Sequence, residues 1–229
     1  MDWLEAWLPY IFVPALVMSL LAQLFVQFVL VRAETVDTRI SGYAVARHVL
    51  DGAGQYEVQV EQVPGQFSEH FETRRNLLQL SHEIYHGRNI ATMAVAAHEA
   101  CHALQNAGRN RWLVIRDLAV PAASFGSGAG ILVAVVGLVT RAQPLLAWGV
   151  VLFSVTVYLQ LLNLPIELHA SYVAQRRLVG LGMVDQEKLP RVRLALFAMA
   201  FTYVGATLQS VFTLVQRVAW LLSRPGGGL

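Results

Sequence analysis

The chain has one cysteine, one lysine and few charged residues of either sign. A single cysteine excludes an intrachain disulfide. Charged residues make up 14% of the 229 positions and the net charge is +2, so the composition does not predict nucleic acid or another polyanion as a partner. Hydrophobic residues make up 55%, which is more than a soluble domain normally carries. The composition therefore predicts a membrane protein.

The apolar excess is concentrated in four runs that lack Asp, Glu, Lys and Arg. Each run reaches the roughly 20 residues that a spanning helix needs. The runs are Ala6–Val31, Leu118–Thr140, Ala142–Ile166 and Leu194–Gln216. We expect the first to be an uncleaved anchor, because Asp2 and Glu5 stand where a signal peptide carries positive charge. Gln209 lies in the fourth run, where a tilted or partly interfacial helix is an alternative.

The arginines indicate which side of the membrane the polar segments face. They cluster in 32–116 and 176–193, whereas the turn between the second and third runs has only Arg141. Short cytoplasmic loops carry the excess of positive charge in membrane proteins. We therefore expect a multi-pass cell-membrane protein with both polar segments in the cytoplasm.

The segment Ala91–Ala107 carries the pattern H-E-x-x-H, with His98 and His102 four residues apart and Glu99 between them. Good helix formers and the absence of Pro and Gly predict a helix here. On a helix this spacing places both imidazoles on one face, where they can bind one metal ion, with Glu99 near its water. Zinc in such a site acidifies water and polarises a peptide carbonyl. The pattern predicts a zinc peptidase.

The residues before this helix predict a small mixed α/β region. The segment Ser41–Leu50 has amphipathic spacing and is followed by Gly52, which indicates a short helix. The alternation in Tyr56–Glu61 predicts a half-buried strand, and Arg75–Ser81 is a second candidate strand. A strand edge beside a metal can bind a substrate backbone. We interpret Arg75–Ser81 as an ordinary sheet strand.

A second H-E-x-x-H lies at His82–His86, between the second candidate strand and Gly87. It has room for barely one helical turn, capped by Ser81, and Ile84 and Tyr85 are mediocre helix formers. We therefore expect no rigid turn to hold these two imidazoles. The later motif is predicted to bind the metal.

A third protein ligand must complete the zinc site, and the candidates follow the third apolar run. Glu167 and His169 both suit zinc, but two residues apart on a helix they point about 200° away from each other. Glu167 shares its face with the small residues Ala170, Ser171 and Ala174, which allow a close neighbour, whereas His169 shares its face with bulkier side chains. We therefore predict Glu167 as the third ligand.

The runs RNLLQLSHEIYHGRNIATMAVAAHEACHALQ, LPIELHASYVA and FTYVGATLQ resemble the YugP-type bacterial neutral zinc metallopeptidases. More distantly, H-E-x-x-H followed by E-x-x-A-x-x-x-A is similar to the HtpX and CAAX-prenyl protease group of membrane gluzincins. The resemblance implies one zinc ion bound by His98, His102 and Glu167, with Glu99 as general base, at a cytoplasmic-side site.

The resemblance also marks four positions where this sequence departs from the usual pattern. Cys101 stands where the family usually has Gly, His169 where it usually has Asp, and His82 where it usually has Pro. Ser171 stands where the related proteases have an Asp against the first ligand histidine. We expect Cys101 to be a small buried side chain, and Ser171 is placed to orient an imidazole.

The sequence thus predicts an α-helical polytopic membrane protein of about four spanning helices with a small α/β gluzincin-like metallopeptidase domain. Its expected parts are an N-terminal anchor (1–31), a catalytic domain (32–117), a transmembrane hairpin (118–166), a third-ligand helix (167–193) and a C-terminal membrane helix with its tail (194–229). The expected function is zinc-dependent hydrolysis of peptide bonds in membrane or membrane-adjacent polypeptides, with the lipid bilayer as a partner. A catalytically silent membrane scaffold or a metal-binding membrane protein is the alternative. A metal transporter is a less suitable interpretation, because the four apolar runs contain no Asp, Glu or His to line an ion pathway.

Overall fold

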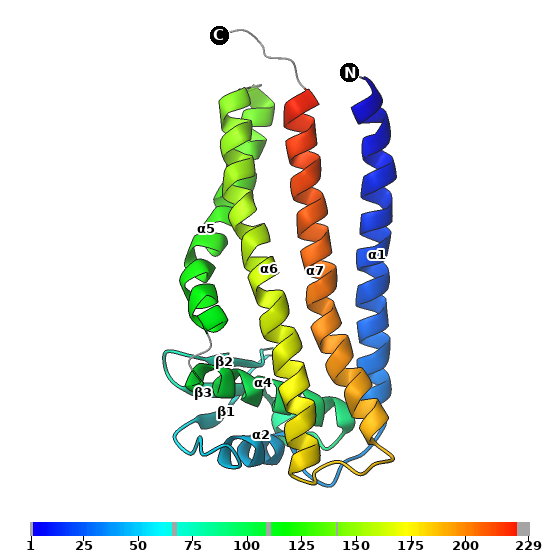
Figure 1. Ribbon diagram of the computed structural model, residues 1–229, viewed down its shortest axis with the longest axis vertical. Coiled ribbons are helices and arrows are strands. Elements are labelled where there is room, and N and C mark those ends of the chain that lie inside the picture. Colours follow the sequence, from blue (N-terminus) through cyan, green and yellow to red (C-terminus); the bar gives the residue numbers. More distant parts are fainter. Residues whose placement is uncertain (1, 66–67, 109–110, 141, 224–229) are drawn as a thin grey trace. The chain divides into compact units, whose positions relative to one another are not determined.

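The computed structural model describes residues 2–65, 68–108, 111–140 and 142–223, which fall into two compact units. The first comprises Met1–Gln23, Val114–Leu164 and Tyr203–Leu229, and the second comprises Leu24–Leu113 and Pro165–Thr202. The helices are α1 (Asp2–Glu34), α2 (Gly42–Asp51), α3 (His82–His86), α4 (Ile90–Ala107), α5 (Arg111–Thr140), α6 (Gln143–Gly180) and α7 (Leu189–Ser223); the strands are β1 (Gln59–Val63), β2 (His70–Glu72) and β3 (Leu77–Ser81). The helices α1, α5, α6 and α7, labelled in Figure 1, each contribute residues to both units.

Two helices in the described part of the chain are long and apolar enough to cross a membrane. They are α6 and the stretch Leu189–Val215 of α7, with mean hydropathies of 2.0 and 1.5 over their most apolar windows. The structure thus supports two spanning helices and not the expected four. The predicted spans 6–31 and 118–140 are helical, within α1 and α5, but many of their side chains lie outside the described residues. Those two spans stay predictions.

The second unit contains a three-stranded sheet in the order β1-β3-β2 (Figure 1). Strand β1 pairs parallel with β3, and β2 pairs antiparallel with it. Both edges of β3 are therefore paired, as expected of an ordinary sheet strand and not of a free edge for a substrate. Leu78 and Leu80 on β3 are fully buried in the hydrophobic core, together with Val45 and Val49 of α2.

The helices next to this sheet begin where their capping residues predict. The Ser41 hydroxyl accepts a hydrogen bond from the Ala44 amide at 3.3 Å and caps α2. The Asn89 carboxamide oxygen accepts one from the Thr92 amide at 2.8 Å and caps α4. Each of these side chains satisfies an amide that has no partner within its helix. The predicted helices over Ser41–Leu50 and Ala91–Ala107 are confirmed to within one residue at either end.

The strands differ more from the sequence prediction. The alternating segment Tyr56–Glu61 enters the sheet only from Gln59, because the Arg47 guanidinium donates to the carbonyls of Gln55 at 2.8 Å and Val58 at 2.6 Å and holds the chain in a turn before it. Strand β3 begins at Leu77, because Asn76 has a φ of 53° and turns the chain. The three-residue strand β2 was not predicted.

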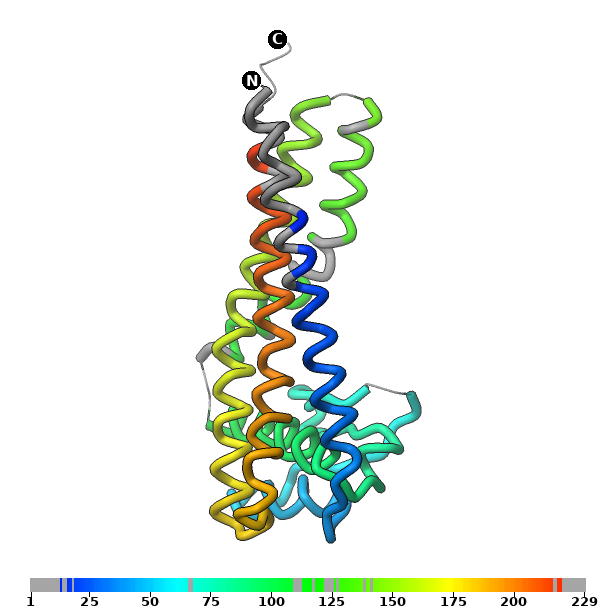
Figure 2. Tube along the Cα trace, turned by 90° about the vertical axis from the view of Figure 1, so that its right-hand side faces the viewer, coloured from blue at the N-terminus to red at the C-terminus, as the bar shows by residue number. Residues whose placement is uncertain are grey.

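The core of the second unit also includes parts of the long helices. Val29 of α1 and Ala198 of α7 are buried against each other's helix, and Figure 2 shows these two segments side by side. Ala170, Ala174 and Leu178 of α6 are fully buried in the same core as α2 and α4. The core therefore holds α6 against α4, the helix of the predicted zinc motif.

Candidate metal centre

Helix α4 places His98 and His102 together on one face, as their spacing predicts. Their Nε2 atoms lie 3.2 Å apart, and their ring centroids are separated by 4.8 Å. Both side chains are buried. The carboxylate of Glu99 belongs to the same cluster, whose ligand atoms all lie within 4.8 Å of one another. The arrangement brings two metal-ligating nitrogens and one carboxylate to a single point.

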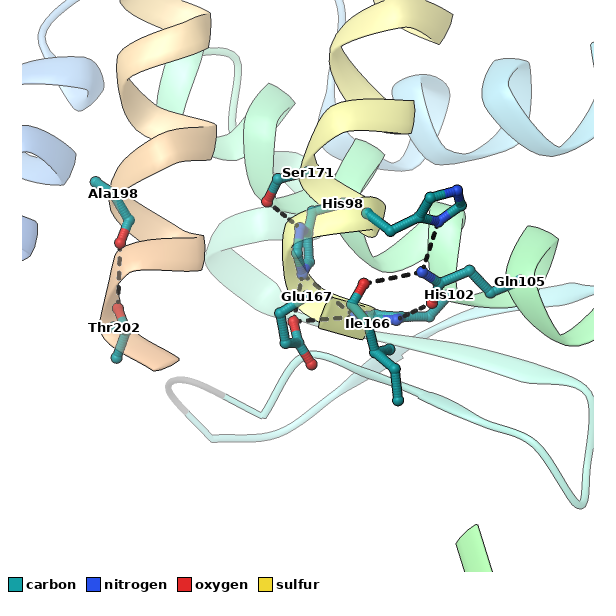
Figure 3. A network of polar contacts seen from close by, with 9 residues as sticks. His98, His102, Gln105, Ile166, Glu167, Ser171, Ala198 and Thr202 are labelled. Atoms are coloured by element: carbon teal, nitrogen blue, oxygen red, sulfur yellow. Dashed lines mark hydrogen bonds and ion pairs between the residues drawn. The ribbon is translucent and has the colours of Figure 1, made fainter. Parts of the chain in front are cut away.

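Glu167 reaches this point from α6. Its Oε2 atom lies 3.0 Å from Nε2 of His98 and 3.4 Å from Nε2 of His102, and its side chain is buried (Figure 3). Ligands at 2.0–2.1 Å from a tetrahedral zinc ion lie about 3.3–3.4 Å apart. The three separations of 3.0, 3.2 and 3.4 Å are close to this value. The donor set and its spacing therefore fit a zinc ion.

The other ring nitrogen of each histidine has its own partner. Nδ1 of His98 lies 3.0 Å from the hydroxyl oxygen of Ser171, and Nδ1 of His102 lies 3.0 Å from Oε1 of Gln105 (Figure 3). Such contacts fix the orientation of a ligand imidazole and the position of its proton. With Nδ1 engaged on both rings, both Nε2 atoms are directed toward Glu167.

Gln105 joins α4 to α6, and the sequence analysis missed it. Its amide nitrogen donates to the Ile166 carbonyl at 2.9 Å and lies 3.1 Å from Nδ1 of His169. The predicted competitor for the third ligand, His169, therefore contacts Gln105 instead of the imidazoles of the centre. A signal for Gln105 was present in the sequence, because it lies three residues after His102 and seven after His98, on the same helix face.

Burial and charge shift the acid–base properties of this cluster. Desolvation raises the pKa of Glu99, and the nearby His102 and His98 offset only part of that effect. Burial lowers the pKa of His102, but the hydrogen bond with Glu167 and the charge of Glu99 outweigh it and raise that pKa overall. A carboxylate with a raised pKa is suited to accept a proton near neutral pH.

Comparison with known proteins identifies the family. The family model described as "Putative neutral zinc metallopeptidase" matches residues 8–222. The chain belongs to this family. It is also 37% identical over 183 residues to "Putative membrane protease YugP" of Bacillus subtilis (strain 168), which covers 80% of this chain and 81% of that protein. No solved structure matches the chain.

Three departures of this family member from the usual pattern lie on or beside the candidate centre. Ser171 contacts His98, and His169 contacts Gln105. Cys101 is fully buried in the core, and burial raises the pKa of its thiol to about 12. Cys101 is therefore a small buried side chain, as expected. Ser171 contacts a histidine of the centre directly, and His169 contacts one through Gln105.

The fourth departure, His82, belongs to the earlier H-E-x-x-H, which forms the single turn α3. Ser81 caps this turn with its hydroxyl 3.4 Å from the Ile84 amide, as predicted. The expectation that this segment cannot hold two imidazoles together is wrong, because the rings of His82 and His86 lie 4.8 Å apart between centroids. Both rings are exposed, and the side chain of Gln62 lies between them.

Proposed function

We propose that this zinc metallopeptidase family member is a membrane-bound endopeptidase that holds one catalytic zinc ion on His98, His102 and Glu167. The observation that carries the proposal is the convergence of the two Nε2 atoms and Oε2 of Glu167, with no separation above 3.4 Å. Family membership and the name of the Bacillus subtilis relative support the same chemistry.

The residues of the centre have different roles in peptide hydrolysis. Zinc, when bound, would supply a Lewis acid that polarises a peptide carbonyl and lowers the pKa of water. Glu99 takes the proton from the attacking water and passes it to the nitrogen of the leaving amine, a role that its raised pKa supports. Ser171 and Gln105 hold the two imidazoles with Nε2 facing inward.

We further propose that the chain crosses the membrane about four times and that the centre faces the cytoplasm. The arginine distribution supports this orientation. The second compact unit, which joins 24–113 with 165–202, supports a catalytic domain over 32–117 that the segment 167–193 completes. Substrates would then be polypeptides in or next to the membrane. Reporter fusions after Arg88 and Lys188 test the orientation: both should report the cytoplasm, and a fusion at Gln143 the opposite side.

The enzymatic proposal is tested by metal analysis of the detergent-purified protein together with cleavage of an unfolded protein such as casein. We expect about one tightly bound zinc ion per chain, and cleavage that a chelator abolishes and added zinc restores. A zinc-loaded protein that cleaves none of several unfolded substrates would point to a silent scaffold. A protein that binds no zinc would reject the centre itself.

A further inference from the structure

The turn α3 and strand β1 bring together three side chains that metal ions bind. The amide nitrogen of Gln62 lies 3.1 Å from Nδ1 of His82, and its Oε1 lies 2.8 Å from Nε2 of His86. The two histidines lie at the two ends of the single turn α3, and Gln62 comes from β1, twenty or more residues earlier. One nitrogen of each ring therefore faces the same carboxamide.

This cluster shares the ring spacing of the candidate metal centre. In both places the ring centroids of two histidines lie 4.8 Å apart, and one side chain from another element lies within 3.4 Å of a nitrogen on each ring. The bridging group is the carboxylate of Glu167 in the buried centre and the carboxamide of Gln62 at the surface. The surface cluster therefore offers two imidazoles and one carboxamide, whose nitrogen faces His82 and whose oxygen faces His86.

The position of α3 is fixed by contacts on its other side. The ring of Tyr85 packs against that of Tyr43 with centroids 4.9 Å apart, and the Gly87 amide donates to the Glu83 carbonyl at 2.9 Å. A Cβ at Gly42 would collide with the Ile84 carbonyl, so α2 lies directly against this turn. The Tyr85 ring also lies against that of His86, with centroids 4.9 Å apart. His82 and His86 are nevertheless exposed, so an ion and its water molecules can reach them.

We propose that His82 and His86 form a second metal site, which binds a divalent transition-metal ion such as Zn²⁺ or Ni²⁺ at the surface. Imidazole nitrogens suit these ions. Gln62 supplies its Oε1 as a further, weaker ligand after its amide rotates, and water fills the remaining positions. The ion ties β1 to α3 and stabilises the second unit. The site takes no part in peptide hydrolysis, and it does not depend on the proposed function.

The test is zinc binding by the full-length, tag-free protein in detergent, measured by equilibrium dialysis and elemental mass spectrometry as free zinc is raised to saturation. We expect about two zinc ions per wild-type chain and about one for His82→Ala/His86→Ala. The matched control is His48→Ala/His70→Ala, which removes two exposed histidines whose Nδ1 atoms contact only nearby backbone carbonyls. This control should still bind about two.

Two further variants separate the surface site from the candidate centre. His98→Ala/His102→Ala removes the candidate centre and should still bind about one zinc ion at the surface site. If this variant bound no zinc while His82→Ala/His86→Ala bound as much as wild type, the surface site would be overturned and the centre would stand. Gln62→Glu gives the surface site a carboxylate and should tighten its zinc affinity by about tenfold or more. Unchanged affinity in Gln62→Glu, or equal zinc in wild type and His82→Ala/His86→Ala at every concentration, would overturn the proposal.

Discussion

The same five-residue pattern occurs twice in this chain, and the two copies differ in what surrounds them. On α4 the histidines lie in the middle of an 18-residue helix, buried, with a carboxylate between them and a polar partner on each far nitrogen. On α3 they lie at the two ends of a five-residue turn, exposed, with a carboxamide between them. Spacing alone produces the histidine pair in both places. Helix length, burial and the charge of the third group distinguish the candidate metal centre on α4 from the surface cluster on α3.

The role of Glu167 as the third ligand can be tested by removing its carboxylate. Glu167→Ala should abolish peptide hydrolysis and weaken zinc binding by orders of magnitude, because an incomplete ligand set binds zinc poorly. His169→Ala is the control from the same helix and should cost at most a small factor in either, since His169 contacts Gln105 and not the imidazoles. Zinc affinity and kcat/KM of both variants measure the difference. A large loss in His169→Ala with little in Glu167→Ala would make the site a three-histidine one.

The two motif glutamates should differ as their surroundings differ. Glu99→Gln should lower kcat by about 10²–10⁴-fold while zinc and fold are kept, because the amide cannot accept the proton. Glu83→Gln, the same change on α3, should leave kcat within a small factor of wild type. Steady-state kinetics with one substrate compare the pair. Equal effects would mean that the choice between the two motifs is wrong.

Replacing a residue that orients an imidazole should affect zinc affinity and activity less than replacing a metal ligand. Gln105→Ala removes the partner of His102 and should lower zinc affinity or activity by about 10–100-fold. Gln62→Ala, which removes the corresponding glutamine beside His82 and His86, should leave peptidase activity unchanged. An unaffected Gln105→Ala variant would show that His102 needs no orienting contact.

The smallest expected effect concerns the thiol on α4. With a pKa of about 12 and no exposed surface, Cys101 should resist alkylation in the folded protein at pH 8, where only roughly one thiol in 10⁴ is ionised. Because the raised pKa keeps the thiol protonated, protection should persist at lower pH and disappear on unfolding. In a Cys101→Ala background, His82→Cys on the exposed turn should label readily. Mass spectrometry after brief iodoacetamide treatment measures both; rapid labelling of native Cys101 would contradict the buried position.

The sequence predicted the parts of the site that local periodicity controls. The helix of the later motif, the face of α6 that carries Glu167 and the contact of Ser171 with an imidazole all follow from spacing along one helix. What it missed depends on contacts between distant residues. Strand β1 starts late because Arg47 holds the preceding turn, and α3 is ordered because Gly42 and Tyr43 of α2 pack against it. The number of spanning helices was predicted from composition, and the structure supports two of the four.

The carboxamide of Gln105 gives the hydrogen bonds around His102 a fixed direction. A backbone carbonyl can only accept, so the group that contacts the Ile166 oxygen must be the amide nitrogen, and Oε1 must then face the imidazole. Nδ1 of His102 therefore carries the hydrogen, and Nε2 keeps its lone pair for a metal. Gln62 has no backbone carbonyl among its contacts with the α3 histidines, so either end of its amide can face either ring. A main-chain oxygen on α6 thus selects the tautomer of a side chain on α4.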